Sequence, residues 1–291
     1  MNTYDLALDI KRILAIFDIS IEYFCDEIGV SRVTINDILN GKKDTFSNEL
    51  LEKIYSYAYR KEIGIDLNRS KELLYLDEAN GKTLLFHGAK NDIDGDIDNK
   101  HSLPPNDFGN GFYTGTTLKQ AASRIAKYEK GSVYCFYLKD IDKLNVLRFN
   151  ADKDWLYAVL YYRKAFTDFV VDENTSKIID KIENSDLVIA PIADNEMFKT
   201  IDSFARNEIT DEACLHAISA SNLGFQYIFK SDLACKHLSF LERLYLCEKE
   251  RNYYLLEKDN LTKEGINKSN LAKIEYRRKG LYFDELFKRK G

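Results

Sequence analysis

The spacing of apolar residues changes near residue 82, and this change limits the possible architectures. Before it, apolar residues recur at helical intervals from about residue 4 to 61. After it, short β-prone runs alternate with helical stretches to about residue 230, and a helical tail follows. A chain of 291 residues with this pattern is expected to hold an all-α domain and an α+β domain. The predicted boundaries are 1–63 for the helical domain, 64–82 for a linker, 83–235 for the α+β domain and 236–291 for a helical, basic C-terminal extension.

Two short helices that meet at a glycine are predicted inside the helical domain. Their apolar positions are Ile21, Phe24, Cys25 and Ile28 in the first helix and Val33, Ile35 and Ile38 in the second. Gly29 separates the helices, and Ser31 is expected to cap the second one. This arrangement is typical of a helix-turn-helix. Residues 21–42 resemble the repressor-type (Xre/Cro) helix-turn-helix family.

In that family, exposed side chains of the second helix contact base edges. The resemblance therefore implies DNA contacts from Arg32, Thr34 and Asn36, with Asp37 beside them. The charge argues against tight binding of DNA, because residues 1–63 hold eight basic and eleven acidic residues. DNA binding is expected to be weak and salt-dependent unless a homodimer supplies a second half-site. The alternative is a protein-interaction or dimerisation module that has the fold without the DNA.

The second domain is expected to form a split antiparallel β-sheet with inserted helices. Strands are predicted at 83–86, 111–114, 187–189 and 225–229, with a further strand pair at 133–138 and 144–149. Helices are predicted at 117–129 and 152–166, and Thr210 is the expected cap of a later helix.

A histidine followed by a glycine, His87-Gly88, ends the first of these strands. About 20 residues later comes Asp107-Phe108-Gly109-Asn110-Gly111-Phe112-Tyr113. Its glycines permit backbone geometries closed to other residues. Taken separately, these elements are typical of a structural histidine and of a glycine-rich hairpin with a packed tyrosine. Together, and followed by an alanine-rich helix, they resemble the diphtheria-toxin-like ADP-ribosyltransferases.

The resemblance is closer to an uncharacterised bacterial family of that superfamily, marked by a D-F-G-x-G-F-Y motif. The stretch from Trp155 to Arg163 resembles its tryptophan-led helix ending in arginine. Residues 185–194 resemble its G-P-x-A-D segment, with Ala190 in place of glycine, and residues 226–229 resemble its closing strand. The resemblance covers residues 83–235.

This resemblance implies that NAD is bound as a substrate. His87 would hydrogen-bond the adenosine-side ribose, the Gly88 backbone would hold the nicotinamide amide, and Tyr113 would stack on the nicotinamide ring. Gly111 belongs to the same predicted cofactor site. Arg124 could reach a phosphate, although a solvated helix residue explains it equally well.

Cleavage of the nicotinamide–ribose bond develops positive charge on the ribose, so an acid or amide close to it is useful. The diphtheria-type group uses a glutamate on a later strand, and the matching residue here is Gln226. An amide cannot act as a base. Asp194 and Glu196 are therefore the leading candidates for a carboxylate that takes this role, and Glu208 is another.

The expected function is NAD-dependent mono-ADP-ribosyl transfer, a glycosyl transfer, to a protein or nucleic acid. Such an enzyme fits a bacterial toxin or a phage-defence effector. The alternative is a non-catalytic DNA-binding regulator with a degenerate NAD-binding domain. Hydrolysis of NAD without transfer is a third reading that the sequence does not separate.

Other classes fit the sequence poorly. The five cysteines are scattered without a C-x-x-C pair, and the four histidines lack metal-ligand spacing, so no metal site and a reducing cytoplasm are expected. No apolar run approaches the roughly 20 residues of a membrane span. A calcium loop starting at Asp92 would need glycine where Ile97 stands and glutamate where Leu103 stands.

The C-terminal residues 260–291 hold nine basic and four acidic residues interleaved with aromatic ones. This composition suits single-stranded nucleic acid. It also suits an amphipathic helix docked on the body of the protein, which is the favoured interpretation.

Overall fold

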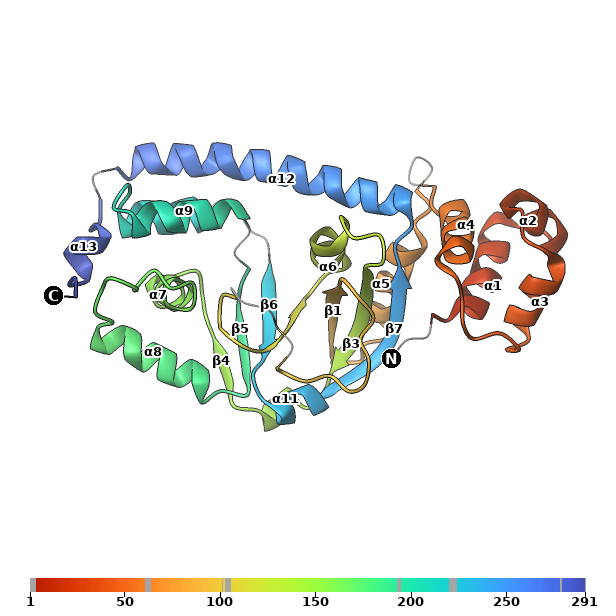
Figure 1. Cartoon of the computed structure of the whole chain (residues 1–291), viewed down its shortest axis with the longest axis horizontal. Coiled ribbons are helices and arrows are strands. Elements are labelled where there is room, and N and C mark those ends of the chain that lie inside the picture. Colours follow the sequence, from red (N-terminus) through yellow and green to blue (C-terminus); the bar gives the residue numbers. More distant parts are fainter. Residues whose placement is uncertain are drawn as a thin grey trace. The chain divides into compact units, whose positions relative to one another are not determined.

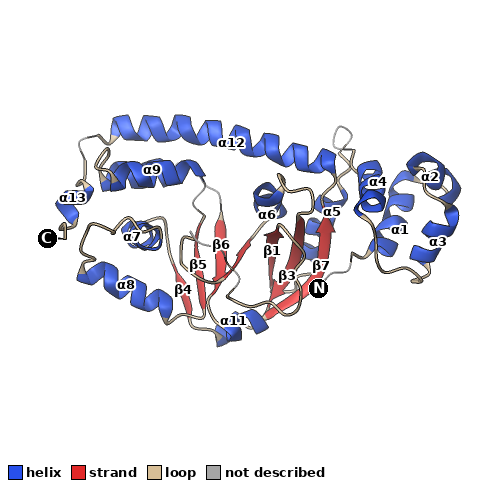
Figure 2. Cartoon of the chain, in the orientation of Figure 1, coloured by secondary structure: helices blue, strands red, loops and turns tan. Residues whose placement is uncertain are grey.

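The computed structural model describes residues 4–60, 64–100, 102, 106–192, 195–219, 224–277 and 279–290. This part of the chain is mixed α+β (Figures 1 and 2). It forms two compact units. The first unit comprises Met1–Asp96, Thr117–Leu138 and Ser239–Glu257, and the second comprises Ile97–Thr116, Lys139–Leu238 and Lys258–Gly291. The units cut across the boundaries expected from the sequence.

The first unit begins with helices α1 (Leu6–Phe17), α2 (Ile21–Ile28), α3 (Arg32–Leu39) and α4 (Asn48–Ala58). A polar side chain precedes each helix and accepts a hydrogen bond from a backbone N–H of its first turn. The predicted cap is confirmed, since Ser31 Oγ accepts from Thr34 N at 3.1 Å. The predicted break is also confirmed, because Gly29 ends α2 with φ +61°.

Helix α5 (Leu67–Asp77) occupies the stretch predicted to be a linker, so that prediction is wrong. Asp66 caps the helix by accepting from Arg69 N at 3.0 Å. The side chains of Asn68, Lys71 and Glu72 are buried, although they are polar. The sequence alone predicts a linker at this polar run, because the buried partners of these side chains are far away in the sequence.

Strands β1 (Thr83–Ala89) and β3 (Ser132–Leu138) pair antiparallel, with His87 opposite Tyr134, and β7 (Leu238–Tyr245) follows β3 in the strand order. Helix α6 (Leu118–Ile125) packs against β1 and β3. The helical extension predicted for residues 236–291 begins instead with the strand β7, and α12 (Glu248–Glu275) follows it. Adjacent charges at Glu242 and Arg243 hide the strand pattern, and both side chains are buried because they are paired, Glu242 with Lys71 and Arg243 with Asp92.

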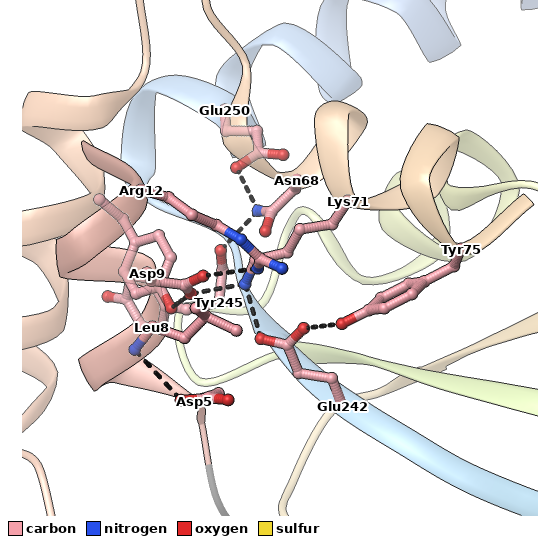
Figure 3. Close-up of polar contacts among 11 residues, drawn as sticks. Asp5, Leu8, Asp9, Arg12, Asn68, Lys71, Tyr75, Glu242, Tyr245 and Glu250 are labelled. Carbon is pink, nitrogen blue, oxygen red and sulfur yellow. Dashed lines mark hydrogen bonds and ion pairs between the residues drawn. The ribbon is translucent and has the colours of Figure 1, made fainter. Parts of the chain in front are cut away.

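Lys71 lies at the centre of a buried polar cluster in this unit (Figure 3). Its ammonium contacts Oδ2 of Asp9 on α1 and, at 2.6 Å, Oε1 of Glu242 on β7. The hydroxyls of Tyr55 and Tyr75 donate to the same two carboxylates. The exposed fractions are 0% for Asp9, 1% for Lys71 and 4% for Glu242.

The apolar core of the N-terminal helices also extends beyond them. It includes Leu67, Tyr245 and Cys247, which come from later parts of the chain. Together with the cluster at Lys71, this shared core makes helices α1–α4 a part of the first unit and not a separate domain.

The strands of the second unit follow the order β4 (Val146–Arg148), β5 (Leu187–Pro191), β6 (Phe225–Phe229), β2 (Phe112–Gly115). β4 is parallel to β5, and the other pairs are antiparallel. The predicted strand pair of 133–138 with 144–149 is therefore wrong. The short 3₁₀ turn Ile141–Lys143 does not close a hairpin, because β3 pairs with β1 whereas β4 pairs with β5.

Helices complete the second unit. They are α7 (Lys153–Tyr162), α8 (Glu173–Glu183), α9 (Asn195–Ala205), α10 (Asp211–Ser219), α11 (Asp232–Lys236) and α13 (Phe283–Leu286), while α12 (Glu248–Glu275) contributes to both units. Thr210 caps α10 as predicted, accepting from Ala213 N at 3.3 Å. Among the described helices, none has the length and hydropathy of a membrane span.

The C-terminal segment is docked on the second unit, as favoured from its composition. Phe283 and Phe287 are buried in a core that contains Trp155. The Phe166 ring packs against both phenylalanines, with centroid distances of 5.3 and 4.7 Å. Phe283 and Phe287 therefore serve packing.

Replacing Lys71 with methionine tests the cluster. Glu242 would remain buried without the Lys71 cation, and Asp9 would keep only its 3.4 Å pair with the partly exposed Arg12. The free energy of unfolding should therefore fall by about 3–5 kcal/mol in urea denaturation of the full chain. Lys53→Met is the control, because it breaks the exposed Lys53–Glu49 pair on α4 and should cost about 0.5 kcal/mol. Equal losses for the two variants would contradict the role of the cluster.

Candidate functional site

Asp107, the first residue of the glycine-rich motif, is the buried centre of a polar site in the second unit. Its Oδ1 accepts from Nε and Nη2 of Arg163 at 3.0 and 2.7 Å. Its Oδ2 accepts from Nε2 of Gln226 at 3.1 Å. Arg163 caps the C-terminus of α7, and Gln226 lies on β6. The structure thus brings together three segments that are far apart in the sequence.

The amide of Gln226 is fixed in one orientation. Its Nε2 donates to Asp107 Oδ2 and also to the carbonyl of Pro191 at 3.2 Å. Both partners can only accept, so the NH₂ group must face them, and its two donors are used. The oxygen Oε1 is the polar atom of the amide that remains for a ligand, and it can act only as an acceptor.

The Pro191 carbonyl also joins α7 to this site. It accepts from the indole Nε1 of Trp155 at 3.3 Å, and the Trp155 side chain is fully buried. The other predicted acids are Asp194, Glu196 and Glu208. Asp194 lies outside the described residues, and Glu196 falls in the first turn of α9. Glu208 is exposed and pairs with Arg206 at 2.8 Å.

Tyr113 on β2 is half-buried, and its hydroxyl bonds to the backbone of earlier residues in the same motif. Its hydroxyl donates to Gly109 O at 2.7 Å and accepts from Phe108 N at 3.2 Å. The Lys230 ammonium donates to Phe108 O at 2.8 Å, and burial lowers the pKa of Lys230. Each hydrogen bond holds a backbone group of the loop that begins at Asp107, so this loop is preorganised.

Packing explains two of the glycines in the motifs. Gly109 has φ +70°, and a Cβ there would lie 2.7 Å from the Tyr162 ring. In the first unit, a Cβ on Gly88 would lie 2.5 Å from Ala121 O, so α6 can approach β1 closely only at a glycine. Gly111 is held through its N–H, which donates to Ser102 Oγ at 3.1 Å.

His87 lies in the first unit on β1 and is half-buried. Leu84 and Phe86 pack with α6 in one core, so strand alternation places His87 on the opposite face. Arg124 lies on α6 with an exposed side chain. The predicted NAD-binding residues thus come from both units, with Gly111, Tyr113 and Gln226 in the second.

The residues expected to contact DNA lie on α3. Arg32 pairs with Glu22 of α2 at 2.5 Å, and the Thr34 hydroxyl is 2.9 Å from Ser31 Oγ at the cap. Asn36 is exposed. Two of the three side chains are therefore engaged within the N-terminal helices.

The fold and the site define an α+β protein whose glycine-rich loop is held by a partly buried ion pair. Residues 83–240 match the family described as "Protein of unknown function (DUF3990)". The matched residues make up more than half of the chain. The chain belongs to this family. Searches of curated proteins and of solved structures returned no match.

The sequence alone assigns no roles to Asp107, Arg163 and Lys230. Asp107 and Arg163 both stand in the motifs quoted above, but no local pattern links two residues that are 56 positions apart. The sequence does not indicate a structural role for Lys230 either, because a lysine after a strand is normally exposed.

Replacing Gln226 with glutamate tests the fixed amide. The new carboxyl would face two acceptors, and the Asp107 charge would raise its folded-state pKa above the ordinary value of about 4.3. An acid whose pKa is raised by folding costs little at low pH and destabilises as pH rises through the unfolded-state value. The melting temperature should approach that of the wild type near about pH 4 and fall below it toward neutral pH.

Gln226→Met is the matched control for this experiment. It removes the same hydrogen bonds without adding a charge, so its loss of melting temperature should be nearly independent of pH. A pH-independent loss for Gln226→Glu as well would show that the amide does not face the Asp107 carboxylate.

Proposed function

We propose that this chain binds NAD and transfers its ADP-ribose to a macromolecular acceptor, a protein or a nucleic acid. The observation that carries the proposal is the cluster of Asp107, Arg163 and Gln226 beside Tyr113. Its residues lie in segments that resemble the ADP-ribosyltransferase pattern in the sequence, and hydrogen bonds join them. A preorganised polar cluster of this kind is common at catalytic sites.

The roles of the cofactor-binding residues follow from the resemblance. Tyr113 presents its ring to the nicotinamide, a cationic ring that favours an aromatic face. His87 holds the adenosine-side ribose, and the Gly88 backbone holds the nicotinamide amide. Arg124 contributes an exposed guanidinium that suits a phosphate.

The reaction breaks the bond between nicotinamide nitrogen and ribose C1′. Nicotinamide leaves with the bonding electron pair, positive charge develops on the ribose, and a nucleophile of the acceptor forms the new bond and loses a proton. Gln226 Oε1 accepts a hydrogen bond from a ribose hydroxyl. The carboxylate of Asp107 faces the NH₂ end of the same amide, so it increases the negative charge on Oε1.

Gln226 has no basic group to take the acceptor's proton. An acceptor with a nucleophilic nitrogen, such as a nucleobase or an arginine, is therefore favoured. Asp194 or Glu196 would act as the base if the acceptor requires one.

One observation favours a second function. Both donors of the Gln226 amide are used within the protein, and a carboxylate is missing from this strand position. A regulator that binds NAD without cleaving it, and binds DNA through residues 1–63, would have these features.

His87→Ala and Gln226→Ala are each expected to lower NAD turnover at least about tenfold, which corresponds to about 1.4 kcal/mol in the barrier. Release of nicotinamide by the purified full chain measures this effect. His237→Ala, a change at a half-buried histidine bonded to Lys139 O, is the control and should keep full turnover.

The outcomes separate the hypotheses. Loss of turnover with His87→Ala but not with Gln226→Ala would mean that another residue fills the third catalytic position. NAD binding without turnover by the wild type would favour the regulator.

A further inference from the structure

An open hollow of about 640 Å³ lies among the N-terminal helices, where α1 ends, α2 begins and α4 ends. Three aromatic residues line it, Phe17, Tyr23 and Tyr57, together with the acidic Asp18 and Glu27 and the basic Arg60. All of these residues belong to the first unit, and the hollow is remote in sequence from the motifs discussed above.

The aromatic wall already holds one guanidinium. Arg60 Cζ lies 5.1 Å from the centroid of the Tyr57 ring and 5.9 Å from that of Phe17. The two rings are 5.3 Å apart, and Arg60 Nε donates to Tyr57 O at 3.2 Å. A cation over aromatic faces is attracted by their quadrupoles, so this wall suits a guanidinium.

The charges of the hollow favour a second cation. Asp18 and Glu27 are exposed carboxylates. Burial raises the pKa of Tyr57, and the nearby charge of Glu27 adds to this rise while Arg60 opposes it. The N-terminus of α2 at Ser20 contributes about half a positive charge. The two carboxylates outweigh this charge and that of Arg60 together. An anion would meet this negative excess.

Tyr23 provides a surface for this second cation. Its side chain is 52% exposed, and the ring stands on α2 in the same hollow as Glu27. A planar guanidinium can stack on a ring and pair with a carboxylate at once, which an ammonium does less well.

We propose that this hollow binds an arginine side chain from a basic segment of a protein partner. The N-terminal helices then recruit a protein, in agreement with the acidic excess of residues 1–63. The internal pairing of Arg32 with Glu22 also leaves α3 poorly equipped to contact phosphates or bases.

Fluorescence anisotropy of the full chain with a labelled peptide of alternating glycine and arginine tests this inference. A peptide with neutral citrulline in place of arginine, and a labelled mixed-sequence DNA duplex, serve as comparison probes. The wild type should bind the arginine peptide and neither of the other two.

Surface variants locate the binding. Glu27→Gln and Tyr23→Ala should each weaken peptide binding about fivefold, near the upper end for an exposed ion pair or cation–π contact. Arg60→Ala should strengthen it, because two ring faces become free. Glu49→Gln, which removes an exposed carboxylate of α4 outside the hollow, should leave the affinity unchanged.

Three results would overturn the inference. They are equal binding of the arginine and citrulline peptides, equal weakening by Glu27→Gln and Glu49→Gln, and binding of the duplex in preference to the peptide. The last result would indicate that these helices bind DNA.

Discussion

The buried ammonium of Lys71 is the interaction on which the first unit depends. A buried cation is costly unless it is paired, and its two carboxylates come from opposite ends of the sequence, Asp9 on α1 and Glu242 on β7. The next residue of α5, Glu72, accepts from Leu118 N at 2.9 Å and so holds the start of α6. α6 in turn packs against β1 at Gly88. A continuous series of buried contacts therefore joins the N-terminal helices to the strand that carries His87.

In the second unit, a different ion pair has the corresponding role. Asp107 of the glycine-rich loop accepts hydrogen bonds from Arg163 and Gln226. Lys230 and Tyr113 donate to backbone carbonyls of that loop and so fix its conformation. This arrangement gives a physical reason for the glutamine at position 226. Asp107 and the Pro191 carbonyl are both acceptors, and only a residue with two donors satisfies them. The same restriction turns Oε1 into a fixed acceptor.

Much of the local structure could be predicted from the sequence, because its signals are local. Ser31 and Thr210 cap helices, Gly29 ends one, and the strand at His87 follows from a β-prone run. The errors concern residues whose environment is set by distant segments. α5 looked like a linker because the pairing of Lys71 with Asp9 and Glu242 has no sequence signal, and β7 was hidden by its buried charges. The role of Asp107 was missed for the same reason, since its partners lie 56 and 119 residues away.

Calorimetric titration of the chain with NAD, using the wild type and two variants of Tyr113, tests the proposed NAD site most directly. Tyr113→Phe keeps the ring but loses the hydroxyl bonds to Gly109 O and Phe108 N, whereas Tyr113→Leu also loses the aromatic face. One NAD should bind per chain, with little change for the phenylalanine variant and a loss of roughly 1–2 kcal/mol for the leucine variant. The absence of binding at millimolar NAD, or equal affinities for the wild type and Tyr113→Leu, would contradict an NAD site at this tyrosine.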